Sequence, residues 1–346
     1  MKDIARDLGV SVVTISKVLR NHPDIGDETR ERVLTRVKEL QYRPNLAARS
    51  LATGCTYLVG LVVPDLLHPF FAEIAKALSD VLKANGYYLL ISSSDEDPEL
   101  EQREVDQLLA RRLDGLIIAS CRPTADLFFR IEKQNTPYVL IDRDLPELSA
   151  NFVGVDDEAV GELATRHLIE VGCKRIAHIR GPKTSPGVQR LEGYKLALAQ
   201  AGMKVNKDYI IAELKGDVET RKRGAEAMAQ LLKRNPRPDG VFCFNDPLAM
   251  SAMNYALDHG VRIPQDLAII GCGNLHYDDL LRVPLSSIDQ DSRRIGAEAA
   301  HITLRMLNSK VRPKCERIVL QPELIVRRST DRRNDKPLSS RDAERS

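Results

Sequence analysis

The stretch KDIARDLGVSVVTISKVLR, residues 2–20, predicts two short helices separated by a tight turn. The apolar residues of the first helix recur at helical spacing: Ile4, Ala5 and Leu8. Gly9 suits the left-handed end of that helix, and Ser11 suits the N-cap of the next one. A helix, a three-residue turn containing glycine and a second helix are typical of a helix-turn-helix unit.

The second expected helix has an apolar face and an outward face. The inward side chains are Ile15, Val18 and Leu19. The outward side chains are Val12, Val13, Ser16, Lys17 and Arg20. Methyl groups at a helix start can contact thymine methyls, and Lys or Arg one or two turns later can bind guanine or phosphate. This arrangement favours the major groove of DNA as the partner of the helix.

A third helix and a short segment complete the first fifty-six residues. Asp27 is the expected N-cap of the third helix, and its expected buried stripe is Val33, Leu34, Val37 and Leu40. The segment LAARSLATG, residues 46–54, is helix-prone but too short to be stable alone in water. Two interpretations remain open. The segment is a hinge helix that folds on DNA with Leu51 as a wedge between base steps, or it is a plain linker.

Length and composition restrict the class of protein. A chain of 346 residues predicts more than one folding unit, and 43% hydrophobic with 29% charged residues is typical of a globular protein. No run approaches 18 apolar residues, and the first ten residues do not form a signal peptide. The six cysteines are scattered without a CxxC pair, so we expect reduced, mostly buried thiols, no metal and no cofactor. These features predict a cytoplasmic protein without a membrane partner.

Charge is distributed unevenly along the chain. Residues 1–56 hold ten Lys and Arg against seven Asp and Glu, and residues 327–346 hold seven against four. The whole chain has a formal charge of +2, so residues 57–326 carry −4. A basic first segment on an acidic body is consistent with a polyanionic partner for that segment.

Strand and helix patterns alternate through the body of the chain. The apolar runs that predict strands are 57–64, 87–94, 115–120, 138–143, 175–181, 208–214, 240–246 and 267–274. Continuously apolar strands between amphipathic helices predict parallel sheets covered on both faces, and so an α/β fold. Ligands of such sheets bind beyond the carboxyl ends of the strands. The sequence becomes polar at those positions, as at Asp142, Arg143 and Asn245.

Residues 4–54, from IARDLGVSVVTISKVLR through TRERV and YRPN to ARSLATG, resemble the head of the LacI/GalR family of bacterial transcription regulators. The resemblance implies an all-α helix-turn-helix head with a hinge helix at about 45–53, followed by a two-lobed, periplasmic-binding-protein-like domain of doubly wound parallel sheets. It also implies a homodimer that binds pseudo-palindromic double-stranded operator DNA, usually as a repressor. Chains of the family begin one or two residues earlier, which implies a natural start slightly upstream of Met1.

The residues that we expect to contact DNA combine the outward face with positions implied by the family. They are Val12, Val13, Thr14, Ser16, Lys17, Arg20, Ala48, Arg49 and Leu51. Two positions depart from the family pattern, because Lys17 stands where Arg is usual and Arg20 where Asn is common. Both remain compatible with DNA contact, but they leave the preferred base sequence open.

The body resembles the same family in GLVVPDLLHPFFAEI, RLEGY, FCFNDPLAM and PELIVRRST, so the resemblance covers residues 2–330. It implies that a small-molecule effector, a sugar or sugar derivative, binds between the lobes. The expected effector-binding residues are Phe70, Phe71, Asp142, Arg143, Arg190, Asn245 and Asn274. Alternatives remain for some positions: the two phenylalanines suit lobe packing, Asn245 suits a structural turn, and Asp157 suits a helix N-cap as well as a ligand contact.

One departure bears on the effector. The family usually places an acid that binds sugar hydroxyls where this chain has Gly273. With Arg143, Arg190 and Lys183 retained, the loss of that acid predicts an anionic effector such as a sugar acid or sugar phosphate. Whether the effector releases or strengthens DNA binding is left open.

The expected division places a DNA-binding head and hinge at 1–56 and the two-lobed domain at 57–330. The first lobe would comprise about 57–157 and 291–316, and the second 158–290 and 317–330. Residues 331–346 are polar and are expected to be disordered. They contain one leucine, so no leucine heptad is available to join two dimers into a tetramer.

Two other functional classes fit less well. The stretch GPKTSPG, residues 181–187, has the wrong spacing for a phosphate-binding loop, and no G-x-S-x-G or HExxH motif is present, so an enzyme is disfavoured. A binding protein of the same two-lobed fold that does not regulate DNA, whether for transport or in the cytoplasm, would leave residues 1–56 without a role.

Overall fold

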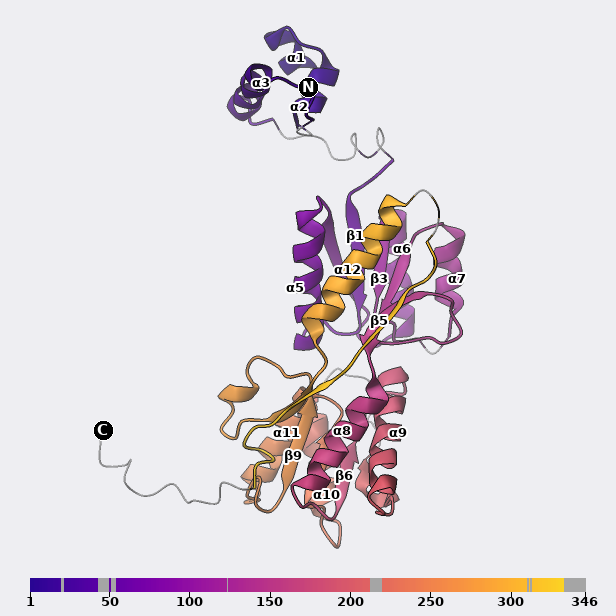
Figure 1. Cartoon of the computed structure of the whole chain (residues 1–346), viewed down its shortest axis with the longest axis vertical. Helices are drawn as coiled ribbons and strands as arrows, with labels where there is room; N and C mark the ends of the chain where they lie inside the picture. Colours follow the sequence, from indigo (N-terminus) through magenta and orange to yellow (C-terminus); the bar gives the residue numbers. More distant parts are fainter. Residues whose placement is uncertain are drawn as a thin grey trace, which may run out of the picture. The chain divides into compact units, whose positions relative to one another are not determined.

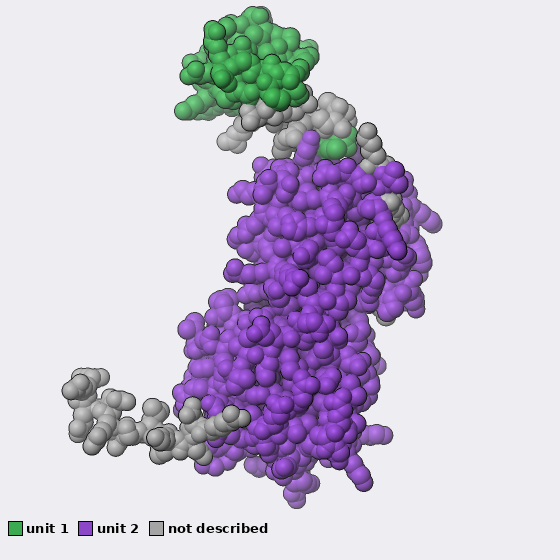
Figure 2. All heavy atoms as spheres, in the orientation of Figure 1, with its two compact units in different colours: residues 1–56 green, residues 57–346 purple. Residues whose placement is uncertain are grey.

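The computed structural model describes residues 1–19, 22–42, 50, 54–122, 124–211, 220–309, 311 and 313–332. The chain divides into two compact units, residues 1–56 and residues 57–346, which Figure 2 shows in different colours.

The first unit is a bundle of short helices around a small core (Figure 1). Its helices are α1 (Lys2–Leu8), α2 (Val12–Leu19) and α3 (Asp27–Glu39). Gly9 ends α1 with φ at 64°, and the Ser11 hydroxyl accepts a hydrogen bond from the Thr14 amide at 3.0 Å. The predicted glycine stop and serine cap of the helix-turn-helix are therefore confirmed.

The third helix differs from its prediction in two respects. Its N-cap is Gly26, and Asp27 is its first residue. Val33 is fully buried and Val37 packs against the core, which confirms half of the predicted stripe, but Leu34 and Leu40 are 47% and 45% exposed. The core of the unit is small, and α3 contributes Val33 and the partly buried Val37 to it. A residue one position further along turns by about 100° around the helix, which carries Leu34 away from that core.

The first lobe of the second unit contains a six-stranded parallel sheet with strand order β11-β5-β4-β3-β1-β2. Its strands are β1 (Leu58–Val63), β2 (Tyr88–Ser93), β3 (Gly115–Ile118), β4 (Tyr138–Ile141), β5 (Asn151–Val155) and β11 (Arg317–Leu320). One face packs against α5 (Pro69–Ala84) and α12 (Ser292–Asn308), which lie side by side in Figure 1. The other face packs against α6 (Pro98–Ala110) and α7 (Asp126–Lys133).

The second lobe repeats this arrangement with strand order β12-β10-β9-β8-β6-β7. Its strands are β6 (Ile176–Ile179), β7 (Ile210–Ile211), β8 (Gly240–Cys243), β9 (Ala268–Cys272), β10 (Ser286–Asp289) and β12 (Glu323–Ile325), the last antiparallel to β10. Helices α8 (Asp157–Glu170) and α9 (Ser185–Gln200) pack on one face. Helices α10 (Thr220–Leu232) and α11 (Asp246–Asp258) pack on the other. Two short 3₁₀ helices, Lys207–Tyr209 and Asp278–Leu280, lie in the loops.

The apolar runs of the sequence explain these layers. In β1, Leu61 and Val63 pack toward α5 and α12, whereas Val62 packs toward α6 and α7. All three side chains are fully buried, because successive strand residues point to opposite faces and both faces are covered. The predicted α/β class with doubly wound parallel sheets is confirmed.

Several features of the second unit were not predicted. Strands β5, β10, β11 and β12 were missed, and the predicted strands extended up to three residues beyond the observed ends. The predicted division placed 317–330 in the second lobe, but β11 pairs with β5 in the first sheet. Within the described residues, the chain passes between the lobes after β5, after β10 and after β11.

The disordered tail was predicted to begin at residue 331, but the structure describes residues 331 and 332. The Arg332 guanidinium donates to the carbonyls of Asp239 and Pro264, at 2.6 and 3.0 Å, so this residue is held against the second lobe. Residues 333–346 lie outside the described residues.

Two glycines let α8 and α9 approach closely. A Cβ at Gly161 would lie 2.1 Å from the carbonyl oxygen of Arg190, and one at Gly193 would lie 2.0 Å from that of Glu158. Any side chain at Gly161 would push α9 away, and Arg190 with it.

The described residues hold no group of three or more His, Cys, Asp or Glu side chains placed to bind a metal ion. In the same residues, no helix combines the length and the apolar character needed to cross a bilayer. All six cysteines are free, but only Cys173, Cys243 and Cys272 are buried, so the expectation of mostly buried thiols holds for half of them.

Candidate functional site

Helix α2 presents an exposed surface at its start. Val12 is 39% exposed and Val13 is 63% exposed, although apolar side chains of this size are usually covered in a small domain. The Thr14 and Ser11 hydroxyls lie 2.9 Å apart at the same end. The surface combines methyl groups with hydroxyls, as contact with base edges in a major groove requires.

Lys17 adds a cation one turn further along. Its Nζ atom lies 3.1 Å from Asp24 Oδ2, and this hydrogen bond is the main cause of the lowered pKa of Asp24. Both side chains are partly exposed, at 35% and 54%, and ion pairs of this kind contribute little to stability. A phosphate or a guanine can therefore compete with Asp24 for the ammonium group.

Five of the predicted DNA contacts are on α2, and the others cannot be placed. Arg20, Ala48, Arg49 and Leu51 lie outside the described residues, as does most of the predicted hinge at 45–53. The choice between a hinge helix and a linker therefore stays open.

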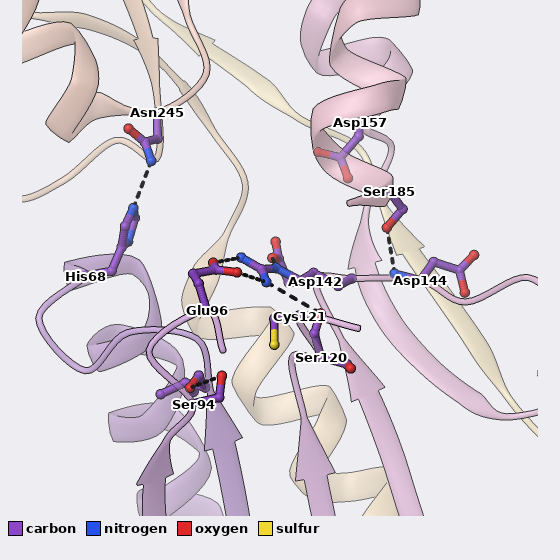
Figure 3. Close-up of polar contacts among 12 residues, drawn as sticks. His68, Ser94, Glu96, Ser120, Cys121, Asp142, Asp144, Asp157, Ser185 and Asn245 are labelled. Carbon is purple, nitrogen blue, oxygen red and sulfur yellow. Dashed lines mark hydrogen bonds and ion pairs between the residues drawn. The ribbon is translucent and has the colours of Figure 1, made fainter. Parts of the chain in front are cut away.

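In the second unit, loops at the carboxyl ends of strands from both lobes surround a narrow pocket of about 20 Å³. It is lined by His68, Phe70, Phe71, Asp142, Arg143, Arg190, Phe244, Asn245, Cys272 and Gln290. Six of the seven predicted effector-binding residues are in this set, and Figure 3 labels His68, Asp142 and Asn245 among the lining residues. The space is large enough for about one water molecule, so it is closed to a sugar-sized ligand.

Arg190 is 3% exposed, and each of its nitrogen atoms has an acceptor. Nε donates to Asp157 at 2.7 Å, one terminal nitrogen donates to the Phe244 carbonyl at 2.7 Å, and the other donates to Gln290 at 2.6 Å. The guanidinium also lies over the Phe244 ring, 4.6 Å from its centroid. Burial raises the pKa of Asp157 and Arg190 opposes that rise. Asp157 is therefore a partner of Arg190 and not an N-cap, which is Asp156.

Arg143 is held in the same way in the first lobe. It forms a two-pronged ion pair with Glu96, with one N–O distance of 2.9 Å (Figure 3). Both side chains are over 90% buried, and Asp142 lies 3.8 Å from the same guanidinium. Arg143 therefore lines the pocket, but its guanidinium is already bound by Glu96, which lies in the loop that follows β2.

The charges around the pocket do not favour an anion. Three carboxylates, Glu96, Asp142 and Asp157, surround two guanidiniums, Arg143 and Arg190. His68 is neutral, because burial first and the two arginines second lower its pKa to about 4. The net charge of these groups is −1, so an anionic ligand would have to displace carboxylates that the arginines already bind.

Two contacts join the lobes at the pocket. The Asp144 amide of the first lobe donates to Ser185 Oγ of the second at 2.7 Å. His68, at the N-terminus of α5, lies 3.1 Å from the Asn245 amide nitrogen, at the N-terminus of α11 (Figure 3). Any ligand that separates these pairs changes the contact between the lobes.

The alternatives for Phe70, Phe71 and Asn245 are not exclusive. Both phenylalanines belong to the core beneath α5 and α12, and both also line the pocket. Asn245 caps α11 by accepting the Leu248 amide at 3.0 Å and contacts His68 through its other amide atom.

Asn274 is not among the pocket residues. Its side chain donates to Asp289 at 2.8 Å and accepts from Arg327 at 2.7 Å, so it ties the loop after β9 to the strands beside it. The backbone at Asn274 is left-handed, with φ at 49°, after Gly273 at 137°. This turn takes the side chain away from the pocket, and the prediction that groups Asn274 with the other cleft residues is not supported.

Four lining residues were not predicted: His68, Phe244, Cys272 and Gln290. Phe244 and Cys272 lie inside the predicted strands 240–246 and 267–274, where the observed strands β8 and β9 end, and could have been found by the same rule that gave Asn245. Gln290 follows β10, whose sequence SSID is too polar to be recognised as a strand.

The structure leaves little space for a side chain at Gly273, the position where the family has an acid. A Cβ at Gly273 would lie 2.9 Å from Asp246 Oδ2, and one at Gly271 would lie 2.1 Å from Asp246 Oδ1. Asp246 is fully buried and accepts from Ser287 Oγ at 2.7 Å and from the Leu275 amide at 3.3 Å. At the observed backbone, a side chain at either glycine would therefore meet the carboxyl of Asp246.

Asp246 adjoins a second buried carboxyl, that of Asp278. Burial raises the pKa of both groups, and their mutual repulsion raises that of Asp278 further, to about 9. Within the part of the chain that the structure describes, neither side-chain oxygen of Asp278 has a partner at full hydrogen-bonding geometry. One proton shared by the pair satisfies this geometry near neutral pH.

Replacing Asp278 with asparagine is expected to remove a pH dependence of stability. The folded pKa of Asp278 exceeds the unfolded value, so its stabilising proton is fully present below about pH 4 and is lost as pH rises toward 9. Relative to wild type, Asp278→Asn should gain up to about 1.4 kcal/mol per pH unit between pH 5 and 7. Urea unfolding at several pH values measures this, with the exposed Asp258→Asn as control. Parallel pH profiles of wild type and Asp278→Asn would contradict the shared proton.

Comparisons with known proteins agree with both units. The family described as "Bacterial regulatory proteins, lacI family" matches residues 1–45, and the "Periplasmic binding protein-like domain" matches residues 165–330. The chain is 34% identical over 332 residues to the HTH-type transcriptional regulator DegA of Bacillus subtilis (strain 168), which covers 95% of this chain and 97% of that one.

Similar solved structures include the transcriptional regulator CelR–cellobiose complex, at 30% identity and a TM-score of 0.72, covering 94% of this chain and 98% of that one. The lac repressor dimer matches at 24% identity and a TM-score of 0.81, covering 95% and 98%, a likeness that concerns the fold.

Proposed function

The chain belongs to the LacI family of bacterial regulatory proteins, and from this premise we propose that it is a transcriptional repressor whose affinity for operator DNA is set by a small molecule bound between its lobes. One observation supports this most strongly. A helix-turn-helix unit with exposed valines on α2 is joined in one chain to a unit with a polar pocket between two lobes.

In this proposal α2 enters the major groove. Val12 and Val13 contact thymine methyls, and Lys17 exchanges Asp24 for a guanine or a phosphate. Arg20 and Arg49 bind phosphates, so the affinity falls steeply with salt. A helix of eight residues buries too little surface for specific binding alone, and a homodimer that places two such helices on a pseudo-palindrome meets the requirement.

The effector is best described as uncharged. The pocket arginines already hold Glu96 and Asp157, so the anionic effector suggested by Gly273 loses its basis. The relative CelR is described in complex with cellobiose, a neutral sugar, and a neutral polyhydroxylated ligand suits this pocket. A ligand that enters must open the 20 Å³ space, and that opening changes the angle between the lobes. The change of angle moves the chain segment before β1, through which the second unit is connected to the DNA-binding unit.

A regulator is preferred to an enzyme because the similar proteins are DNA-binding regulators. A two-lobed binding protein without a role on DNA is the runner-up. A protein that binds chromosomal DNA acts in the cytoplasm, and we place this chain there.

The test begins with selection of duplexes from a random pool by the full-length chain. We expect an inverted repeat to be enriched. The Kd for that repeat, measured by fluorescence anisotropy at fixed salt, should change by about 5- to 150-fold with at least one neutral sugar from a metabolite panel. Absence of an enriched motif contradicts DNA regulation, and an enriched motif whose Kd no metabolite alters contradicts control by an effector.

A further inference from the structure

His68 occupies the junction between two cavities in the second unit. It lines the closed 20 Å³ pocket and also a groove of about 1340 Å³ between the lobes. The groove is lined in part by Pro69, Tyr255 and Tyr277. Because the groove is large enough for a sugar or a small oligosaccharide and the pocket is not, a ligand in the groove reaches the pocket at His68.

The hydrogen bonds of Asn245 fix the proton on the His68 ring. Asn245 Oδ1 accepts the Leu248 amide at 3.0 Å, so the other amide atom, Nδ2, is the one that faces His68. An amide nitrogen can only donate, and His68 Nε2, at 3.1 Å, must therefore accept. A neutral imidazole that accepts at Nε2 carries its proton at Nδ1.

That Nδ1–H group is a buried donor without an acceptor. The other polar side chains of the pocket are engaged: Arg190 with Asp157 and Gln290, and Arg143 with Glu96. Among the described pocket residues, His68 alone has a buried side-chain polar atom with no partner. A buried donor of this kind is unfavourable unless a water molecule or a ligand supplies the hydrogen-bond acceptor.

We propose that His68 is an effector-recognition residue, whose Nδ1–H donates to an uncharged hydroxyl, ether or carbonyl oxygen of the ligand. This inference rests on the proposed function and names the side-chain atom through which the pocket recognises its ligand. An uncharged oxygen fits because the surrounding groups already carry one excess negative charge. His68 also contacts Asn245 of the second lobe, so a ligand bound at Nδ1 lies beside a contact between the lobes.

A matched pair of variants separates the two nitrogen atoms. Asparagine places a donor where His68 has Nδ1 and cannot reach Asn245, whereas glutamine places an acceptor near Nε2 and removes the Nδ1 donor. The probes are glucose, ribose, cellobiose, glucosamine, gluconate and glucose 6-phosphate. Kd values come from titration calorimetry with the full-length protein, for each probe that raises the wild-type melting temperature.

The expected result is that His68→Asn binds such a probe within about threefold of wild type and His68→Gln binds it about tenfold more weakly. The reverse order would show that His68 joins the lobes without contacting the ligand. Equal Kd values for wild type and both variants would show that a water completes Nδ1. Either result overturns the proposal.

A second measurement does not need a ligand. In ¹⁵N-histidine-labelled full-length protein at pH 7, with His68 assigned by comparison with His68→Gln, we expect the neutral Nδ1–H tautomer. The Nε2–H tautomer or a charged ring overturns the inference. If no probe binds the wild type, the effector part of the proposed function and the assignment of His68 both fail for this panel. If probes bind and their Kd values do not distinguish the two variants from wild type, only the assignment of His68 fails.

Discussion

Replacement of Val13 by glutamate is expected to weaken operator binding by about 100-fold or more without unfolding the first unit. Val13 is 63% exposed, so the change removes little core packing. In the proposed complex the new carboxylate would meet base edges and phosphates, and each lost base contact corresponds to about 1–3 kcal/mol. A dimer with two such helices loses the contact twice, which gives a factor of this size.

The matched control is Leu34→Glu. Leu34 is also an exposed apolar residue of the first unit, at 47%, but it lies on α3. We expect this variant to bind the selected operator within a few-fold of wild type. Anisotropy titrations of wild type and both variants at one salt concentration give the comparison. Equal losses for the two variants would show that α2 is not the helix that reads DNA.

The second large effect is expected from Arg190→Met. Methionine keeps most of the length of the side chain but removes every donor that holds Asp157, Gln290 and the Phe244 carbonyl. Asp157 then remains buried without its cation. Breaking a buried pair on one side typically lowers stability by about 3–5 kcal/mol. The unfolding transition of the second unit, followed in urea by circular dichroism, measures the loss, and the effector response should disappear.

Two controls show whether burial is the cause. Arg130→Met breaks a pair with Asp106 whose side chains are 48% and 39% exposed, and should change the free energy of unfolding by less than about 1 kcal/mol. The double variant Asp157→Asn with Arg190→Met should recover part of the stability, because no charge is left unpaired. A loss in Arg190→Met no larger than in Arg130→Met would contradict the account of the pocket.

Helices α1 and α2 of the first unit could be predicted from residues 2–20. Their glycine stop, serine cap and apolar spacing are local signals, and they specify local structure. The error at Leu34 has a different origin. Helical spacing shows which side of α3 carries the apolar residues. It does not show how many of those residues the apolar surface of α1 and α2 can cover.

The second unit shows where sequence signals end. Strands buried on both faces, such as β1, were recognisable as apolar runs. Strand β10 was not, since SSID is polar. Its buried Ser286 pairs with Ser329 and Thr330, and its buried Ser287 donates to Asp246. Strand β11 pairs with β5, about 165 positions earlier in the chain, and no local pattern carries that pairing.

The same limit applies to the pocket. Positions after strands identified Asp142, Arg143 and Asn245, but not the direction in which each side chain points. Asn274 was misplaced because the left-handed turn at Gly273 and Asn274 reverses the chain. The anionic effector was inferred from arginines whose partners, Glu96 and Asp157, are distant in sequence or were read as caps.

The coupling between the pocket and the DNA-binding unit is tested most directly by reciprocal titration. The Kd of the selected operator is measured without and with a saturating neutral ligand, and the Kd of that ligand is measured without and with operator. Thermodynamic linkage requires that the operator factor equal the product of the ligand factors at the two sites of the dimer, and we expect the operator factor to lie between about 5 and 150. A factor of one in both titrations, with the ligand shown to bind, would contradict the claim that ligand binding between the lobes controls the affinity for operator DNA.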